Sequence, residues 1–546
     1  MAGPNLDPVQ SPTLTDSQWE RLTSAAEPRD VAAGDDVFRS GERDYPMILV
    51  ATGEVEIVRD ALAWAEEEIL ARLGPGSIVG ELGLLNGQAA FLSARVVEAG
   101  RMYVLPRSQL RRIMNEDDEL CDIILHALWA RRESLRRGSA AWTLKFLGRE
   151  GSSEFLALRR FAERIDLIHA AHAVTDHDVH LAGSSGKTAF TADDLPVAFI
   201  QGEPIVRATP GIVADRLGLS YQGQADEVVD LVVVGGGPAG LAAAIYGASE
   251  GLETVLLDAV APGGQAASTS RIENFLGFPF GVSGSDLIGQ ATLQALKFGV
   301  RVYAPCEAIA IERHGDDLDV TLADGRRIRT RSTIVTSGAS YRRLQLDRWE
   351  DFERSGIYYA ATPLELRQVA ASPVVVVGGA NSAGQAALYL SSNGCPVHLV
   401  VRGDDLSARM SSYLVDRLTD DPRVQVHTRS HIVGLEGDRG LRRVAIDSVG
   451  EVDARGLFCF IGADPATGWL PDLDRDDDGF VRTGTDITVQ SLTRWQAMGR
   501  EPLPFETSLP RIFAAGDVRR GSMKRVAAAV GEGSSAVASV HRALAG

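Results

Sequence analysis

The chain has 546 residues, 45% of them hydrophobic and 23% charged, which suggests roughly three or four domains with ordinary buried cores. Its net charge of -18 argues against a nucleic-acid-binding surface and against attraction to an anionic membrane. No signal peptide and no apolar run of membrane-spanning length is recognised, and the cysteines show neither CxxC nor metal-ligand spacing: Cys121, Cys306, Cys395 and Cys459. A reducing, cytoplasmic location without a bound metal is expected.

The first predicted elements are short strands. Residues 1–30 are polar and contain several prolines, so a mobile lead-in is expected there. Short apolar runs separated by glycines then predict a small all-β barrel or roll, at 47–51, 55–58, 69–73, 78–79, 94–97 and 102–105. Apolar residues recur at helical spacing over 107–137, which predicts a helix.

This segment resembles the cyclic-nucleotide-binding domain in its runs 53–57 and 73–85. In that family a Gly-Glu pair, here Gly80-Glu81, begins the phosphate-binding segment, and the glutamate binds the ribose. An arginine about ten residues later neutralises the cyclic phosphate, because a dry pocket leaves an unpaired phosphate charge at high cost. The chain departs from the family here: the next arginine, Arg95, falls in the following strand, and the expected positions hold Ala90, Phe91 and Leu92. Cyclic-nucleotide binding is therefore not expected, and the alternative is an interaction or dimerisation module.

Residues 139–224 predict a small α/β unit. A strand within 142–147, a helix over 154–164, a strand-like run at 166–171 and a closing helix near 211–217 alternate along it. The stretch Leu195-Pro-Val-Ala-Phe-Ile-Gln-Gly resembles the end of a glutaredoxin/thioredoxin-like domain, whose proline, here Pro196, is usually cis. No cysteine lies between Trp142 and Glu154, where the dithiol of such domains would be. We expect a degenerate spacer rather than an electron carrier, because thiol exchange needs a thiolate.

The stretch from Asp230 to Asp258 predicts a strand, a tight glycine turn, a helix and a second strand that ends in an acid. The first glycine permits the turn, the second lets a pyrophosphate approach the backbone, and the third lets helix and strand pack closely. Free N–H groups at the helix start favour an anion, and a carboxylate about twenty residues later can bind ribose hydroxyls. A dinucleotide site is therefore predicted. Its residues are Asp258 and the turn residues Gly235, Gly237, Pro238, Ala239 and Gly240.

Three further motifs begin at Ala261, Ser270 and Pro510, and the last reads Pro-Arg-Ile-Phe-Ala-Ala-Gly-Asp-Val. Together with the glycine turn they resemble the thioredoxin reductase family (class II pyridine nucleotide-disulfide oxidoreductases) of two-domain flavoproteins, over about 226–546. The resemblance implies FAD, with Asp517 on its ribityl chain and a helix start facing the pyrimidine edge of its ring. A positive helix end there stabilises the anionic reduced flavin. The further residues that it implies are Gly264, Gln265, Asn274, Gly516, Arg525 and Val526.

A second strand, turn and helix begin at Val374. The next strand ends at Arg402, where an acid would bind a free 2′-hydroxyl, and Arg409 follows one or two turns later. Arginine at this point suits a 2′-phosphate, which favours NADPH over NADH, and the alternative is a solvated surface arginine. Ala380 replaces the family's second glycine and adds a methyl group where the pyrophosphate comes closest. The predicted site residues are Gly378, Ala380, Asn381, Ser382, Ala383, Arg402 and Arg409.

Thioredoxin reductases carry a CxxC just before this second turn, and it passes electrons from the flavin to thioredoxin. This chain reads Gly356-Ile-Tyr-Tyr-Ala-Ala-Thr-Pro-Leu-Glu there, with Ala360 and Pro363 at the cysteine positions. A thiol–disulfide relay through this site is therefore excluded on chemical grounds. Tyr358 and Tyr359 either fill the vacated site or simply belong to the core.

The sequence thus predicts a multidomain chain: an N-terminal β-roll, a small thioredoxin-like α/β unit and two Rossmann-like α/β domains for FAD and NADPH. The expected boundaries are 1–30 for the lead-in, 31–138, 139–224, 225–342 with 463–546 for the FAD domain, and 343–462 for the inserted NADPH domain.

The expected function is that of a homodimeric oxidoreductase that passes hydride from NADPH to FAD. No side chain is needed as acid or base, so no catalytic residue is predicted. The acceptor stays open among a small electron-carrier protein such as ferredoxin or flavodoxin, a quinone, a diffusible disulfide and oxygen. Ferredoxin–NADP reductases are the leading analogy. The alternatives are a redox or ligand sensor that signals through the N-terminal domains, and a scaffold that keeps FAD for structure.

Overall fold

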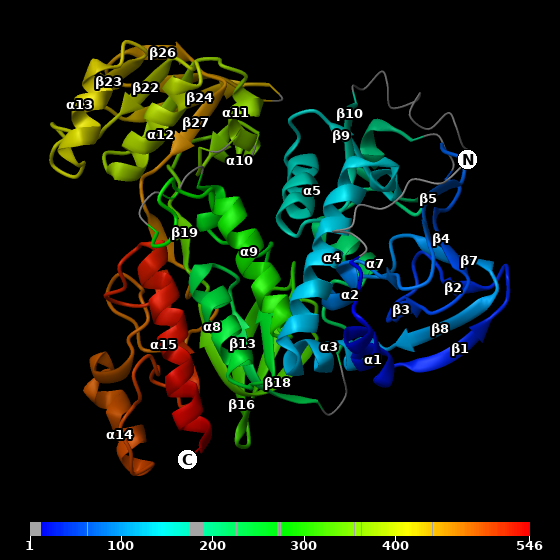
Figure 1. The fold of residues 1–546 in the computed structure, drawn as a ribbon. Coiled ribbons are helices and arrows are strands. Elements are labelled where there is room, and N and C mark those ends of the chain that lie inside the picture. Colours follow the sequence, from blue (N-terminus) through cyan, green and yellow to red (C-terminus); the bar gives the residue numbers. More distant parts are fainter. Residues whose placement is uncertain are drawn as a thin grey trace.

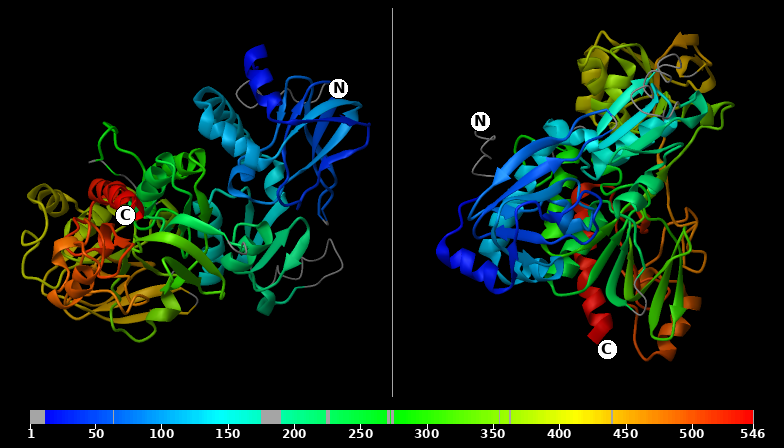
Figure 2. Two further views of the ribbon diagram at one scale, coloured as in Figure 1. Left: turned by 90° about the horizontal axis from the view of Figure 1, so that it is seen from below. Right: turned by 90° about the vertical axis from the view of Figure 1, so that its right-hand side faces the viewer.

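The structure is a computed structural model, and it describes residues 12–62, 64–174, 190–223, 227–269, 272, 275–353, 355–361, 363–438 and 440–545. The N-terminal β domain and the small α/β unit, blue to teal in Figure 1, lie on one side of the molecule. Two larger α/β domains, green to red, lie on the other side. The view from below keeps the N-terminal domain and the C-terminal helix on opposite sides (Figure 2).

The N-terminal domain is a β-roll of two four-stranded sheets, in the orders β1-β8-β3-β6 and β2-β7-β4-β5. Each apolar run predicted as a strand forms one, and α4 packs on the core that the strands enclose. The strands are β1 (Glu27–Val31), β2 (Asp36–Phe38), β3 (Met47–Val50), β4 (Glu54–Arg59), β5 (Glu68–Leu73), β6 (Ile78–Val79), β7 (Ser93–Glu98) and β8 (Gly100–Leu105). The helices are α1 (Asp16–Ser24), α2 (Gly83–Asn86), α3 (Arg107–Glu116) and α4 (Asp118–Arg137).

Two predictions for this domain are wrong in part. Residues 1–30, predicted as a mobile lead-in, contain helix α1, whose N-cap is Thr15. The Thr15 side chain accepts the N–H of Gln18, and the Gln18 side chain accepts the N–H of Thr15. The helix predicted over 107–137 is interrupted at Asp117. The backbone of Asp117 is extended, and its carboxylate caps α4 by accepting the N–H of Leu120 at 3.0 Å.

The small α/β unit has one four-stranded sheet in the order β10-β9-β11-β12. β10 (Ala170–Val174) is parallel to β9 (Leu144–Arg149), β11 (Val197–Ile200) is antiparallel to β9, and β12 (Glu203–Ile205) is antiparallel to β11. The helices are α5 (Ser153–Arg164), α7 (Pro210–Leu217), η1 (Ser139–Thr143) and η2 (Ala192–Asp194). The strand predicted at 166–171 starts only at residue 170, because Asp166 takes a left-handed φ of 58° behind α5. The Leu195–Pro196 peptide is cis, as the resemblance implies.

The FAD-type domain is built on a sheet in the order β15-β14-β13-β18-β17-β16, with β29 beside β18. The pairings among β15, β14, β13, β18 and β29 are parallel, so the carboxyl ends of these strands meet at one edge. The strands are β13 (Val228–Val234), β14 (Thr254–Leu257), β15 (Arg301–Tyr303), β16 (Ala308–His314), β17 (Asp317–Leu322), β18 (Arg327–Val335) and β29 (Ile512–Ala514). The helices are α8 (Pro238–Ser249), η3 (Ala266–Ser268), α9 (Gly284–Lys297), η4 (Gly484–Asp486), α14 (Val489–Ala497), η5 (Gly516–Val518) and α15 (Val526–Ala545).

The inserted domain has a five-stranded parallel sheet in the order β20-β27-β21-β22-β23 and a three-stranded antiparallel sheet β24-β25-β26. The chain enters through β19 (Ala339–Tyr341) and leaves through β28 (Ala463–Pro465), which pair with each other. The strands are β20 (Ile357–Tyr358), β21 (Val374–Val377), β22 (Val397–Val400), β23 (Val424–His427), β24 (Ile432–Gly437), β25 (Leu441–Ile446), β26 (Gly450–Asp453) and β27 (Gly456–Cys459). The helices are α10 (Trp349–Phe352), α11 (Pro363–Val369), α12 (Asn381–Ser392) and α13 (Ser412–Asp420). The predicted pair of Rossmann-like domains is confirmed.

No helix among the described residues has both the length and the apolar content that a membrane span requires. Within the same residues, no three His, Cys, Asp or Glu side chains gather as a metal ion would need.

Candidate functional site

The first glycine turn lies where β13 ends and α8 begins. Gly235 has a φ of 111°, and Gly237 is the N-cap of α8, with Pro238 as its first residue. A Cβ at Gly240 would lie 1.8 Å from the carbonyl oxygen of Gly235, so only glycine allows this approach of helix and turn. No side chain caps α8, which leaves the N–H groups of Ala239 and Gly240 available to an anion.

Asp258 follows β14 and faces this turn. Its carboxylate accepts the N–H groups of Gly236, Val260 and Ala261 at 2.8, 2.9 and 2.8 Å. Burial raises the pKa of Asp258, while these bonds and the positive charge of Arg164 act in the opposite direction. Asp258, the predicted ribose-binding acid, therefore lies beside the turn, and each of its carboxylate oxygens accepts at least one backbone hydrogen bond.

The loop after β14 lies over the turn. A Cβ at Gly264, whose φ is 51°, would lie 3.2 Å from the Cα of Gly237. Gln265 is exposed and donates from its amide nitrogen to the carbonyl oxygen of Ala339 at 3.3 Å. Asn274, the third residue predicted on this side, lies outside the described residues.

Asp517 lies in η5, which also reaches the start of α8. Gly516 has a φ of 77°, and a Cβ there would lie 2.8 Å from the Cβ of Ala239. Asp517 is partly buried and makes no hydrogen bond with any described residue. Burial raises its pKa, and the charge of Lys524 opposes this effect. A half-buried carboxylate without a donor fits a ligand that carries hydroxyl groups.

Glu532 was not predicted, although it fixes the position of η5. It accepts the N–H of Gly516 at 2.8 Å and forms two bonds with the Arg519 guanidinium at 3.0 and 2.8 Å. A Cβ at the neighbouring Gly533 would lie 2.0 Å from the carbonyl oxygen of Ala239, so α15 packs directly on α8. An acid between two glycines early in the closing helix was the available signal. Arg525 and Val526 lie at the start of α15, as predicted.

The second glycine turn joins β21 to α12. Gly378 has a φ of 145°, and a Cβ there would lie 2.4 Å from the carbonyl oxygen of Phe460. Ala380 has an extended backbone, which any residue can adopt, and it precedes α12 without a capping side chain. Asn381 and Ser382 are exposed at the helix start, and Ala383 is buried beneath them. The alanine is therefore tolerated by the backbone, and the helix start remains open.

Arg402 and Arg409 follow β22. Both are exposed, and neither guanidinium has an ion-pair or hydrogen-bond partner in the part of the chain that the structure describes. Most other arginines in the described ranges pair with a carboxylate, so these two remain available for an external anion.

A family model, "Pyridine nucleotide-disulphide oxidoreductase", matches residues 229–533, more than half of the chain. The chain belongs to this family. A second model, "Cyclic nucleotide-binding domain", matches residues 28–117, as the N-terminal resemblance predicted.

Several thioredoxin reductases are similar to this pyridine nucleotide-disulphide oxidoreductase. NADPH-dependent thioredoxin reductase 3 of Arabidopsis thaliana is 34% identical over 336 residues, 58% of this chain and 58% of its own length. The thioredoxin reductase of Streptomyces clavuligerus is 31% identical over 326 residues, 58% of this chain and 95% of its own. The solved thioredoxin reductase of Lactococcus lactis is 28% identical with a TM-score of 0.50, and covers 58% of this chain and 99% of its own.

In this oxidoreductase the two residues predicted at the family's cysteine positions lie in the segment after β20 and at the start of α11. Ala360 is partly buried and Pro363 is exposed at the first position of α11. Tyr358 is buried and packs on Phe458, with ring centroids 5.1 Å apart. The prediction that this residue belongs to the core is therefore confirmed. Tyr359 stacks on Tyr341 at 4.8 Å. All four cysteines are free and buried, and burial raises the pKa of Cys306 and of Cys459 to about 12.

Helix α5 of the small unit lies beside this segment (Figure 1). Arg160 forms an ion pair with Glu365 of α11 at 3.2 Å, and the Glu365 side chain is only 9% exposed. A cavity of about 390 Å³ separates the loop at Gly151 from Tyr358 and Arg455. One turn along α5, the charge of Arg164 acts on Asp258 of the first nucleotide site. Helix α5 therefore forms an ion pair with the inserted domain, and its charge also acts on the first nucleotide site.

The glutamate that binds ribose in cyclic-nucleotide-binding domains is already paired in this chain. Glu81 forms an ion pair with Arg132 of α4 at 2.7 Å and accepts the N–H of Gly83 at 2.8 Å. Arg132 is 1% exposed. Phe91 and Leu92, which stand where the phosphate-binding arginine would be, pack in the core of the small α/β unit. The segment that binds phosphate in that family therefore forms a domain contact here.

Proposed function

We propose that this protein is an FAD-dependent oxidoreductase that takes hydride from NADPH and passes electrons to an acceptor that meets the flavin directly. The observation that carries the proposal is the pair of glycine turns, each at an open helix start and each with an unpartnered charged group. That group is Asp517 at the first turn, and Arg402 with Arg409 at the second.

The residues at the first turn suit FAD. When bound, FAD supplies the ring that accepts hydride from NADPH. The N–H groups at the start of α8 bind its pyrophosphate, Asp258 takes ribose hydroxyls, and Asp517 takes the ribityl chain. Gly264 and Gln265 line the cofactor, and the backbone around Arg525 and Val526 offers the positive end of α15.

The residues at the second turn suit NADPH. The start of α12 binds the pyrophosphate, and the two exposed arginines bind the 2′-phosphate that NADH lacks. Ala380 narrows the approach to the backbone by one methyl group. This preference rests on the exposure of the two unpartnered arginines after β22 and on similarity to a reductase described as NADPH-dependent.

We propose that the electrons leave without an internal dithiol. Ala360 and Pro363 carry no thiol, and the four cysteines are buried and unpaired. The acceptor is a small electron-carrier protein of the ferredoxin or flavodoxin kind, a quinone, a diffusible disulfide or oxygen. The chain works as a homodimer, and light scattering should give twice the mass of one chain.

Rapid-mixing absorbance tests this function. Under anaerobic conditions NADPH should bleach the flavin band, and ferricyanide or ferredoxin should restore it over many turnovers. A flavin band that NADPH leaves unchanged would overturn the proposal.

A sensor is the second candidate, favoured by the ion pair of α5 with α11 of the inserted domain and by the charge of Arg164 near Asp258. If the protein is a sensor, NADPH should reduce the flavin once, and none of the electron acceptors named above should support repeated turnover.

A further inference from the structure

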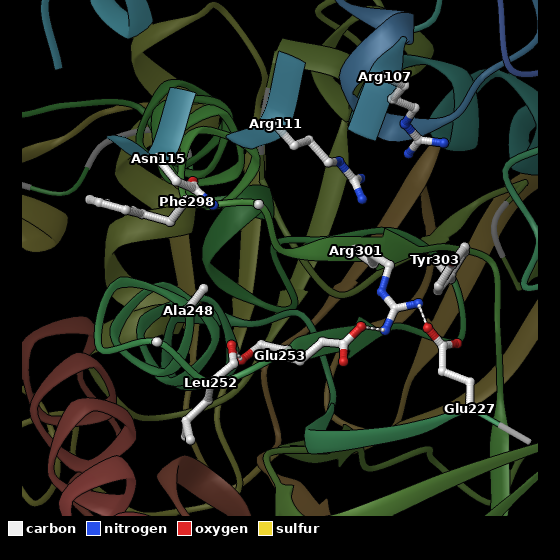
Figure 3. A pocket seen from close by; sticks show the side chains of 13 residues that line it. Arg107, Arg111, Asn115, Glu227, Ala248, Leu252, Glu253, Phe298, Arg301 and Tyr303 are labelled. Carbon is white, nitrogen blue, oxygen red and sulfur yellow. Dashed lines mark hydrogen bonds and ion pairs between the residues drawn. The ribbon is translucent and has the colours of Figure 1, made fainter. Parts of the chain in front are cut away.

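A second cavity, of about 480 Å³, lies between the N-terminal β domain and the FAD-type domain (Figure 3). Helix α3 contributes one wall, and the turn between α8 and β14 together with the start of β15 contributes the other. The cavity lies at the end of α8 opposite to the glycine turn, so it is separate from both nucleotide sites. Its volume falls in the range of about 300–1,000 Å³ typical of small-molecule sites.

Three arginines face this cavity: Arg107, Arg111 and Arg301. Arg301 is neutralised, because it forms ion pairs with Glu227 at 2.7 Å and with Glu253 at 2.8 Å. In Figure 3 the guanidinium of Arg111 points from α3 toward Arg301.

The other two arginines lack comparable partners. Arg111 donates to the carbonyl oxygen of Leu85 at 2.9 Å and has no ion pair with any described residue. Arg107 donates to the same oxygen at 3.2 Å. Its nearest carboxylate, Asp44, lies 3.6 Å away and is 84% exposed, and the Nε of Arg107 is buried with no hydrogen-bond partner.

The two guanidiniums also repel each other. Burial lowers the pKa of Arg111 to about 10, and the charge of Arg107 adds to this effect. Burial lowers the pKa of Arg107 in the same direction. Both remain positive at neutral pH, so this partly desolvated pair of cations has only the exposed Asp44 as counter-charge among the ion pairs of the described residues, in a chain whose net charge is -18.

We propose that this cavity binds the phosphate group of a small phosphorylated molecule, with Arg107 and Arg111 as its ligands. A guanidinium pair matches a phosphate dianion in charge and in hydrogen-bond geometry. The cavity has more room than a phosphate needs, so an organic group attached to the phosphate also fits. The amide of Asn115 supplies a further donor or acceptor.

Titration calorimetry on the full-length, flavin-loaded protein tests this site. The probes are inorganic phosphate, pyrophosphate and ADP, each against sodium chloride of equal ionic strength. Saturable heat with a phosphate compound is expected. Equal affinity for phosphate and ADP identifies the free ion as the ligand, whereas tighter binding of ADP identifies a phosphate ester. Absence of saturable heat with all three probes would overturn the proposal.

Substitutions locate the site. Arg111→Gln and Arg107→Gln should each weaken binding at least about tenfold, because each removes a charged hydrogen bond. Arg112→Gln is the matched control, since Arg112 is the next residue of α3 and is exposed. Glu253→Gln releases Arg301 from one of its carboxylates and should tighten binding. Equal affinities in all four variants would show that the anion binds elsewhere. The flavin spectrum of each variant reports its folded state independently of the anion.

Discussion

Asp517 is a carboxylate held in position without a hydrogen-bond donor of its own. Hydrogen bonds to a charged group contribute about 1.5–3 kcal/mol, so Asp517→Ala should weaken FAD binding about 10- to 150-fold. The measurement is flavin retained per chain and FAD affinity by fluorescence. Asp477→Ala is the control, because Asp477 is an exposed acid of the same domain. Unchanged FAD affinity in Asp517→Ala would contradict the assignment.

The same residue predicts a pH dependence. Burial raises the pKa of Asp517, so on acidification the free protein loses this charge at a higher pH than an ordinary aspartate would. The ionised carboxylate, which accepts hydrogen bonds from FAD, is fully present above that pKa and is lost as the pH falls through it. FAD affinity should therefore fall on acidification in the wild type and fall less in Asp517→Asn. Parallel pH profiles for the two proteins would rule out this role.

Arg402 and Arg409 should discriminate between the nicotinamide cofactors. Replacing either by glutamine should raise the KM for NADPH about tenfold and leave the KM for NADH unchanged, because only NADPH carries the 2′-phosphate. Arg417→Gln serves as the control, since Arg417 is exposed on the neighbouring helix α13. An equal effect on both cofactors would indicate a general charge effect instead.

Among the elements, α5 carries the ion pair that joins the small unit to α11 of the inserted domain. Arg160→Ala removes the ion pair with the nearly buried Glu365, which costs about 1–3 kcal/mol. Amide hydrogen exchange should become faster in both α5 and α11. Arg159→Ala is the matched control, because Arg159 pairs with Glu163 and lies over the Phe155 ring, both on its own helix. Faster exchange in α5 alone would show that the ion pair does not couple the two helices.

The ion pair between Arg132 of α4 and Glu81 leads to a prediction about cyclic nucleotides. Arg132 is paired with Glu81, the glutamate that a bound ribose would need, and residues 90–92 include no arginine that could neutralise a phosphate. Calorimetry with cAMP and with cGMP should therefore show no saturable heat. A binding isotherm that Arg107→Gln leaves unchanged would show that the family's pocket functions in spite of this pairing.

At the scale of the whole molecule, the route of the electrons should be independent of thiols. Burial holds the pKa of Cys306 and of Cys459 near 12, so at pH 9 only about one part in a thousand is thiolate. Iodoacetamide added after NADPH should leave ferricyanide reduction unchanged, and the rate should show no thiolate-linked rise between pH 7 and 9. Inactivation by alkylation would identify a thiol on the route.

Sequence patterns predicted most of this architecture, because each domain has strong local signals. Alternating apolar runs identified the strands of the β-roll, and the glycine turns identified both nucleotide-binding folds. The failures are of two kinds. Helix ends such as Asp117 depend on a single capping contact, which periodicity over 107–137 does not resolve. Long-range contacts, between domains for Arg160 with Glu365 and within the N-terminal domain for Arg132 with Glu81, join residues far apart in sequence, and no local pattern indicates them.

The packing of Phe91 and Leu92 has a consequence for synthesis of the chain. These residues belong to the β-roll in sequence, but the core that covers them includes Leu217, whose carbonyl oxygen also accepts the N–H of Ala89 at 2.9 Å. Leu217 leaves the ribosome more than a hundred residues later, which at about 5–20 residues per second leaves two apolar side chains uncovered for several seconds. The nascent β-roll is thus incomplete on its own, and a chaperone that binds apolar segments would find its target there until the small α/β unit has been translated.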